Sequence, residues 1–542
     1  MNETTSTNAG FHETPCGWVS LITFIVCILC VIITPRIPIF LHVDKIKRLY
    51  NRIKGKKHES RVHTDDDPNS IDTPRTTEQT FYWMVLDMST APVLSLIFLL
   101  CTTCLNWNIF TSGIVGDEKI RPFGIIILFM SLNYICISID ITGIFEYTSK
   151  KIIAKSRQRG HFLYILFSVF ASVLTLFTSN DIVILTLTPI CCYLARCCTN
   201  LNVLPFVVTQ FFLANIWSIA FQIGNPTNMI VAEAYNMDFL TYFLWMGIPA
   251  AVAGLVSFFL LYAIFYKQIP AKIILIDESN NQQEQGKINN KIVVVLKCVI
   301  LLCCLVTLAI TSLIKLPSGT TIPSFLICLF FFILNFILDI FLDAKEMVKK
   351  DRHQIKNYLN TNSNLVLILK RMPWKIIPFV FCMFVMVQML DVYHFISMVS
   401  NALKIVIQKL SNQPLYSEKS TLWSIMCGCL TISIVSTIAC NLLNNQPMTI
   451  LFTKVLMDES FKTNQDLEKG TSLCLILGSN LGANVTIIGA LAGIMWMEIL
   501  KNNGITSKQM NYFKFLMYGM MVTPFVLLLS TVVIGFEVYI MS

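Results

Sequence analysis

The stretch Phe221-Gln-Ile-Gly-Asn-Pro-Thr-Asn-Met-Ile-Val-Ala232 divides a long apolar segment, and this division decides how the chain folds. Pro226 lacks a backbone N–H and disfavours a helical conformation of the residue before it, so Gly224 to Asn228 should not continue a helix. Non-helical backbone at membrane depth persists only where it is buried in protein or lines a cavity. We therefore expect a broken helix over residues 205–234; a Pro-kinked helix with satisfied side chains is the alternative.

A second interruption of the same kind, Gly478-Ser-Asn-Leu-Gly-Ala-Asn-Val-Thr486, lies in the other half of the chain. Discontinuous helices at corresponding positions of two halves are typical of secondary transporters, which form their solute and ion sites there. We expect a second broken helix over residues 471–500. Because the interruptions are paired, a simple kink is the weaker interpretation of either one.

The composition indicates a multi-pass helical membrane protein. Of the 542 residues, 55% are hydrophobic and 13% are charged, about half the charged fraction of a soluble domain, and the mean hydropathy is +0.65. The net charge of +9 does not indicate nucleic acid, because the basic residues lie in short loops between apolar runs, as the positive-inside rule predicts. The 19 cysteines lie mostly inside apolar runs and are interpreted as buried hydrophobes.

The order of apolar and polar runs divides the chain into two repeats. The expected segments are an extracytoplasmic N-terminus (1–17), a first membrane helix (18–43), a basic, disordered cytoplasmic linker (44–80), a first repeat (81–266), a cytoplasmic loop (267–290) and a second repeat (291–542). The remaining spans are expected near 91–112, 122–147, 242–266, 291–314, 321–342, 373–392 and 512–540. Each half then has five spans, and an odd number reverses the second half, which predicts an inverted repeat.

Each half also contains an apolar segment with two short arms. The first, 161–195, is divided at Thr178-Ser-Asn-Asp181, and the second, 422–456, at Leu443-Asn-Asn-Gln-Pro447. Because each arm of the first is short for a full span, we interpret both segments as re-entrant hairpins that enter from opposite sides. The expected fold class is an all-α polytopic membrane protein with two inverted halves, each with about five transmembrane helices, one re-entrant hairpin and one broken helix.

The four interruptions are rich in amide and hydroxyl side chains. Broken helices leave N–H and C=O groups unpaired, and their N-terminal ends suit anions or polarised oxygens. Amides and hydroxyls can bind a small polar solute without burying a fixed charge, which is costly at the bilayer centre. We therefore expect the site to be built from the four interruptions, Ser179–Asp181, Gly224–Asn228, Asn444–Gln446 and Asn480–Thr486.

Asp181 is the only acid among the four interruptions. A carboxyl group within the membrane is a candidate proton or cation carrier, so we assign coupling to Asp181. The alternative is an aspartate that caps the following helix, and one residue can do both. Asp140, Glu146, Asp391 and His394, at or near the ends of expected spans, are weaker candidates, because interfacial ends tolerate charge.

Four motifs together resemble the arsenite permease branch of the ion transporter superfamily, which has a citrate transporter-like domain. They are Thr178-Ser-Asn-Asp-Ile-Val-Ile-Leu-Thr-Leu-Thr-Pro189, Ile223-Gly-Asn-Pro-Thr-Asn-Met-Ile230, Asn444-Asn-Gln-Pro-Met448 and Gly478-Ser-Asn-Leu-Gly-Ala-Asn-Val-Thr-Ile-Ile-Gly-Ala-Leu-Ala-Gly-Ile-Met-Trp496. The resemblance implies an elevator-type carrier that exchanges arsenite or antimonite for protons. It also implies which residues line the substrate and coupling-ion site, at the hairpin tips and in the helix breaks: Asn180, Asp181, Asn444, Asn445, Asn225, Thr227, Asn228, Asn484 and Thr486. Cys440, four residues before the second tip, could bind soft trivalent arsenic, although packing is the favoured interpretation.

We therefore expect a secondary active transporter rather than an enzyme, in the plasma membrane, that exports arsenite or antimonite by proton exchange and uses no cofactor or metal. The alternative is a sodium- or proton-coupled carrier for citrate, another carboxylate or an inorganic anion. The four motifs contain no Lys or Arg that would balance a carboxylate. The expected partners are a small inorganic or carboxylate solute, a coupling proton or sodium ion and the lipid bilayer; a homodimer is left open.

Overall fold

The computed structural model describes residues 15–39, 82–117, 120–196, 198–274, 290–314, 322–348, 363–414, 421–461, 463–506 and 508–541. The expected linker, most of the expected N-terminal segment and residues 275–289 therefore lie outside the described residues. Nine of the described helices are long and apolar enough to cross a membrane, so the chain is an integral multi-pass protein with a helical fold, as predicted. Among the described residues, the strands form one antiparallel pair, β1 (Arg36–Ile39) and β2 (Tyr82–Val85).

The helices fall into two sets along the chain. The first set is α1 (Pro15–Ile33), α3 (Thr90–Cys101), α4 (Trp107–Val115), α5 (Pro122–Ile141), α6 (Ile144–Lys155), α7 (Gly160–Phe177), α8 (Asn180–Arg196), α9 (Leu204–Trp217), α10 (Pro226–Ala234) and α11 (Phe239–Phe265). The second set is α12 (Lys291–Leu313), α13 (Ser324–Met347), α15 (Asn364–Arg371), α16 (Ile376–Val392), α17 (Phe395–Ser411), α18 (Leu422–Leu443), α19 (Asn445–Met457), α20 (Gln465–Gly482), α21 (Leu491–Asn502) and α22 (Tyr512–Met541).

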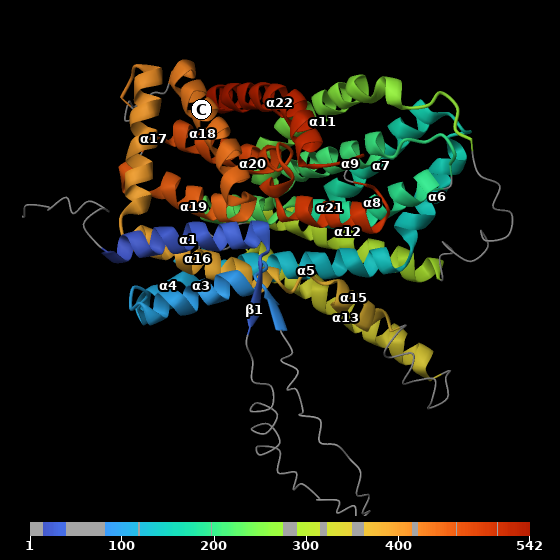
Figure 1. Ribbon diagram of the computed structural model, residues 1–542, viewed down its shortest axis with the longest axis horizontal. Helices are drawn as coiled ribbons and strands as arrows, with labels where there is room; N and C mark the ends of the chain where they lie inside the picture. Colours follow the sequence, from blue (N-terminus) through green and yellow to red (C-terminus); the bar gives the residue numbers. More distant parts are fainter. Residues whose placement is uncertain are drawn as a thin grey trace, which may run out of the picture.

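The same order of elements occurs in both sets: a buried helix, a helix set at an angle to it, a helix pair, a broken helix and a long helix. The turn between the first two is alike in both, because Gly143 between α5 and α6 and His394 between α16 and α17 have φ angles of 80° and 60°. The N–H of each donates to the carbonyl three residues earlier, that of Asp140 or Asp391. In Figure 1, α6 and α17 lie at opposite ends of the molecule.

One helix of each set packs among helices of the other set. Helix α16 of the second set packs against α1, α3 and α4 of the first, whereas α5 of the first set packs against α12 and α13 of the second. These two groups lie side by side in the lower part of Figure 1. Neither set could therefore bury its helices alone, because each supplies the central helix of the other's group.

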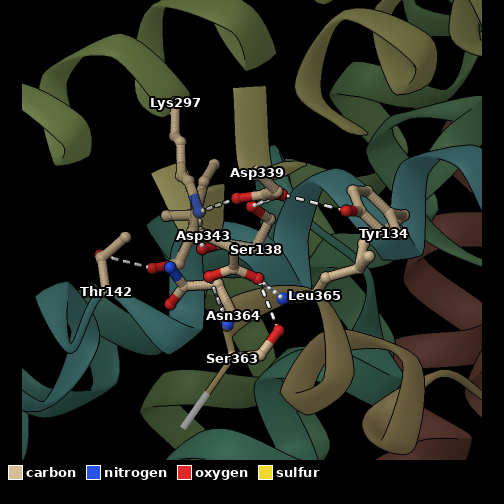
Figure 2. Close-up of polar contacts among 10 residues, drawn as sticks. Tyr134, Ser138, Thr142, Lys297, Asp339, Asp343, Ser363, Asn364 and Leu365 are labelled. Atoms are coloured by element: carbon tan, nitrogen blue, oxygen red, sulfur yellow. Dashed lines mark hydrogen bonds and ion pairs between the residues drawn. The ribbon is translucent and has the colours of Figure 1, made fainter. Parts of the chain in front are cut away.

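A buried ion pair joins the group of α5, α12 and α13 (Figure 2). Lys297 Nζ of α12 lies 2.7 Å from Asp339 Oδ1 of α13, and it donates to the Ser138 carbonyl of α5 at 3.1 Å. Asp339 Oδ2 accepts from Tyr134 at 3.1 Å and from the Ser138 hydroxyl at 2.9 Å. Such a pair is stable in an apolar environment only if its other hydrogen-bonding groups are also satisfied, as most are here.

One turn later on α13, Asp343 holds the beginning of α15. Its carboxylate accepts from the Ser363 hydroxyl at 2.6 Å and from the backbone N–H groups of Asn364 and Leu365 at 2.9 and 3.0 Å. These N–H groups have no partner inside α15, and a negative charge at a helix N-terminus is favourable. Figure 2 shows both carboxylates of α13 and their partners together.

Three spans differ from their expected limits. The first membrane helix, expected over 18–43, ends at Ile33, and Arg36–Ile39 form strand β1 instead. The run near 91–112 is divided into α3 and α4, because Thr103 adopts a left-handed conformation with φ 57° and Asn106 caps α4 by accepting from the Ile109 N–H at 2.8 Å. The run near 122–147 ends as a helix at Ile141. Glu146 consequently lies in α6 and pairs with Lys150 at 3.0 Å near the surface.

Candidate functional site

The turn of the first helix pair brings an amide and a carboxylate together. Helix α7 ends at Phe177 and α8 begins at Asn180, which is buried. Asn180 Nδ2 donates to Asn215 Oδ1 of α9 at 2.9 Å. Asp181 lies half-buried in the first turn of α8, without a hydrogen bond or ion pair to any described residue. It is therefore an unpaired acid next to the amide cluster.

A narrow cavity of about 10 Å³ borders this turn, lined in part by Thr178, Ser179, Ile223 and Met229. This space is enough for about one water molecule. The Ser179 hydroxyl is buried and has no hydrogen-bond partner among the described residues. An unpaired buried hydroxyl is costly, so this turn is suited to contact a polar ligand.

The first break lies slightly earlier than the motif suggested. Helix α9 ends at Trp217, two short 3-10 turns follow, and Asn225 is extended, with φ −151° and ψ 142°. Pro226 is already the first residue of α10, the helical position that tolerates proline best. A Cβ at Gly224 would lie 2.2 Å from the Ser218 carbonyl oxygen, so only glycine fits this turn.

All three polar candidates of the first break are buried. Asn225 accepts from the Thr227 N–H at 3.2 Å and donates through Nδ2 to Asn480 Oδ1 at 2.8 Å. Asn228 donates to the carbonyls of Ser218 and Phe221. The Thr227 hydroxyl is buried and has no hydrogen-bond partner among the described residues.

The turn of the second helix pair consists of a single residue. Asn444, with φ 68° and ψ 152°, separates α18 from α19, and its Nδ2 donates to the Ile488 carbonyl at 3.2 Å. Asn445 is the first residue of α19 and is also buried. The second turn is thus bonded directly to the second helix break.

The second break runs from the end of α20 at Gly482 to the start of α21 at Leu491. Asn484 Oδ1 accepts from Asn215 Nδ2 at 2.9 Å, and the Thr486 hydroxyl donates to Asn441 Oδ1 at 2.5 Å. Helix α22 passes directly over this break, because a Cβ at Gly519 would lie 2.5 Å from the carbonyl oxygens of Asn484 and Val485.

Asn480, which was expected in the second break, lies inside α20 and joins the two breaks. Its Nδ2 donates to Asn228 Oδ1 at 2.7 Å, and its Oδ1 accepts from Asn225 and from the Ser218 hydroxyl. Asn215 has the same function between the first turn and the second break. The structure therefore brings Asn180, Asn225, Asn228 and Asn484 into one cluster.

Sequence reasoning gave no role to Asn215, Ser218 or Asn441. Asn215 and Asn441 are amides in apolar helices that lead into a break or a turn, and this position was the signal available in the sequence. Cys440 is buried, and its thiol donates to the Gly489 carbonyl at 3.1 Å, so it packs against the second break. In the described part of the chain, no group of three His, Cys, Asp or Glu residues could hold a metal ion.

The cluster offers many hydrogen-bonding groups and no fixed charge. Its hydrogen-bonded members are Asn180, Asn215, Ser218, Asn225, Asn228, Asn480 and Asn484. Buried amides of this kind supply both donors and acceptors. Asp181 adds one acid at the first turn, in the first turn of α8.

Three similarities relate the chain to known proteins. Residues 76–467 match the family model described as Citrate transporter. The chain is 20% identical over 400 residues to the putative arsenical pump membrane protein of Bacillus subtilis (strain 168), a match covering 72% of this chain and 82% of that protein. It is 23% identical over 459 residues to the P protein of Homo sapiens, covering 73% of this chain and 52% of that protein.

Among solved structures, the YdaH transporter of Alcanivorax borkumensis superposes with a TM-score of 0.51 at 8% identity, over 96% of this chain and 97% of that chain. At this identity the likeness concerns the fold alone. It covers nearly the whole chain, including the helix pairs and the broken helices described above.

Proposed function

The chain belongs to the citrate transporter family, and from that premise we propose that it is a secondary active transporter that exports arsenite or antimonite in exchange for protons. The observation that carries this proposal is the cluster of neutral amides that joins the first helix turn to both helix breaks through Asn215 and Asn480. Arsenious acid is largely uncharged near neutral pH, and neutral polar groups suit it. The arsenical pump relatives support this choice of solute.

In this proposal the helix pairs α7–α8 and α18–α19 are re-entrant hairpins, and the two sets of helices are inverted repeats. Helices α7 to α11 and α18 to α22 carry the solute as one body, and the groups built on α5 and α16 form the fixed part. The buried Lys297–Asp339 pair supports this assignment, because it fastens α5, α12 and α13 together. We place the protein in the plasma membrane, and a homodimer remains an open alternative.

The second candidate is a sodium- or proton-coupled carrier for citrate, another carboxylate or an inorganic anion, which the family description favours. A carboxylate would require a compensating cation or strong donors at the tips. No Lys or Arg lies within the four motifs, which argues against a multiply charged anion.

Transport by purified protein in proteoliposomes distinguishes the arsenite and antimonite exporter from the carrier for carboxylates or inorganic anions. We expect uptake of arsenite and antimonite driven by an imposed proton gradient, with no effect of sodium. Uptake of citrate or phosphate driven by sodium, without uptake of arsenite, would overturn the proposal in favour of the second candidate.

A further inference from the structure

The amide side chains of the site have a defined direction. An amide nitrogen and an amide oxygen are nearly alike in shape, so which one faces a ligand is decided by their hydrogen-bond partners. A backbone carbonyl oxygen settles the orientation, because it accepts hydrogen bonds and cannot donate. Several amides of the cluster donate a hydrogen bond to such a carbonyl through Nδ2.

The first series of bonds starts at the Phe212 carbonyl of α9. Asn484 Nδ2 donates to it at 3.2 Å, so Asn484 presents Oδ1 to Asn215. Asn215 must therefore present Nδ2 to Asn484 and Oδ1 to Asn180, at 2.9 Å in each case. Asn180 uses Nδ2 for this contact, and its Oδ1 is the atom left over.

Asn180 Oδ1 is buried and has no hydrogen-bond partner among the described residues. The second helix turn also has an unpaired amide oxygen, and here a single hydrogen bond fixes its orientation. Asn444 Nδ2 donates to the Ile488 carbonyl, and Asn444 Oδ1 is buried and likewise unpaired in the described part of the chain. Each helix turn therefore has an unpaired amide oxygen, and the hydrogen bond made by the nitrogen of the same amide fixes the direction of that oxygen.

We propose, building on the transport function above, that Asn180 Oδ1 and Asn444 Oδ1 select solutes that donate hydrogen bonds, namely neutral hydroxylated acids, and reject carboxylates. Asn215 is the positioning residue that fixes the direction of Asn180. A neutral trihydroxy acid carries O–H donors, and an O–H can pair with a buried amide oxygen of this kind. A carboxylate has acceptors only and would leave both amide oxygens unpaired against like partial charge.

Discrimination of this kind is strong, because a site built to hydrogen-bond a hydroxyl rejects an analogue that lacks it. Antimonite counterflow in proteoliposomes containing the full chain measures it, with boric acid and succinate as competitors at neutral pH. Boric acid is then a neutral trihydroxy acid, whereas succinate has only carboxylate groups. We expect boric acid to inhibit at a concentration at least about tenfold below that of succinate.

The variant Asn215→Leu removes the partner that orients Asn180, so the Asn180 amide can rotate and present its nitrogen. Because this variant also breaks the Asn215–Asn484 contact, it is compared by binding rather than by transport. We expect the ratio of the succinate to the boric acid dissociation constant, measured by thermal shift of the purified protein, to fall about tenfold. The matched control is Asn335→Leu, which changes a buried amide of α13 outside the cluster and should leave this ratio unchanged. If Asn215→Leu is not recovered as folded protein, Asn215→Ser, whose hydroxyl is too short to replace both contacts, serves in its place.

The outcomes separate this inference from the proposed function. Antimonite transport inhibited equally by succinate and boric acid, or a ratio of dissociation constants unchanged in the Asn215 variant, would overturn the inference and leave the function standing. If antimonite is not transported, binding of boric acid and succinate, measured by the thermal shift of the purified protein, replaces counterflow. Selective stabilisation by boric acid would then support the inference while the function fails, and stabilisation by succinate or sodium alone would overturn both.

Discussion

Lys297 Nζ lies 2.7 Å from Asp339 Oδ1, and both side chains are buried between α5, α12 and α13. Opposite charges attract strongly in an apolar environment, but each also loses its hydration, and the two effects nearly cancel. Loss of one partner of such a pair is costly, because the other charge then stays buried without a counter-charge. The contact thus fastens two helices of the second set to one of the first.

Removing one partner should therefore cost more than removing both. We expect Lys297→Met or Asp339→Asn alone to destabilise the protein by about 3–5 kcal/mol, because an uncompensated charge is left buried. The double variant should recover most of this loss. Thermal unfolding of purified protein in detergent gives the comparison, and a double variant as unstable as either single one would contradict the expectation.

The amides that join the two breaks should be needed for transport. Asn225→Leu removes the acceptor of the Thr227 N–H and one of the two donors to Asn480 Oδ1, whereas Asn484→Leu removes the acceptor of Asn215 Nδ2 and a donor to the Phe212 carbonyl. Each leaves a buried partner unpaired, at a cost of about 1–3 kcal/mol. We expect folded, membrane-inserted protein without antimonite transport.

The control for these variants is Asn335→Leu, which should transport normally. Insertion and folding are checked by a single symmetric peak in size-exclusion chromatography. Near-normal transport by Asn225→Leu would show that the first break is only a structural kink.

The extent to which the site could be predicted depends on whether its signal is local. The helix turns at Thr178–Ser179 and Asn444 lie within the expected divisions, because short apolar arms bounded by polar residues are a local pattern. Asn215 and Asn484 are 269 residues apart, and only packing reveals that they meet. Lys297 and Asp339 did carry a signal, as charges inside expected spans, but their pairing is equally non-local.

The orientation in the membrane remains a prediction of charge distribution. We expect residues 44–80 and 345–371 to be cytoplasmic and Asn2 to be extracytoplasmic, because Lys and Arg gather in loops of one side. In a background without accessible cysteines, Ser60→Cys should resist a membrane-impermeant maleimide in intact cells, whereas Asn8→Cys should react. Strong labelling at position 60 from outside would overturn the inverted-repeat arrangement.

Asp181 should couple transport to protons. A neutral solute gains nothing from the membrane potential, so uphill transport requires a group that binds a cation on one side and releases it on the other. Asp181 is unpaired at the first helix turn, whereas Asp140 is held by Arg371 at 2.9 Å and by Thr186 at 3.4 Å. A carboxylate already paired with a cation is the poorer proton carrier, because the pair stabilises its ionised form.

The substitution Asp181→Asn keeps the size of the side chain but removes its titration. We expect this variant to exchange antimonite for antimonite at equilibrium, since the amide cluster is intact, yet to lose accumulation driven by a proton gradient. Proteoliposomes measure both activities, counterflow without a gradient and uptake with one, at pH 6 to 8. Asp140→Asn is the matched control and should retain both, because its proton is not the one transported. If Asp181→Asn still accumulates antimonite in a pH-dependent way while Asp140→Asn does not, the coupling group is Asp140.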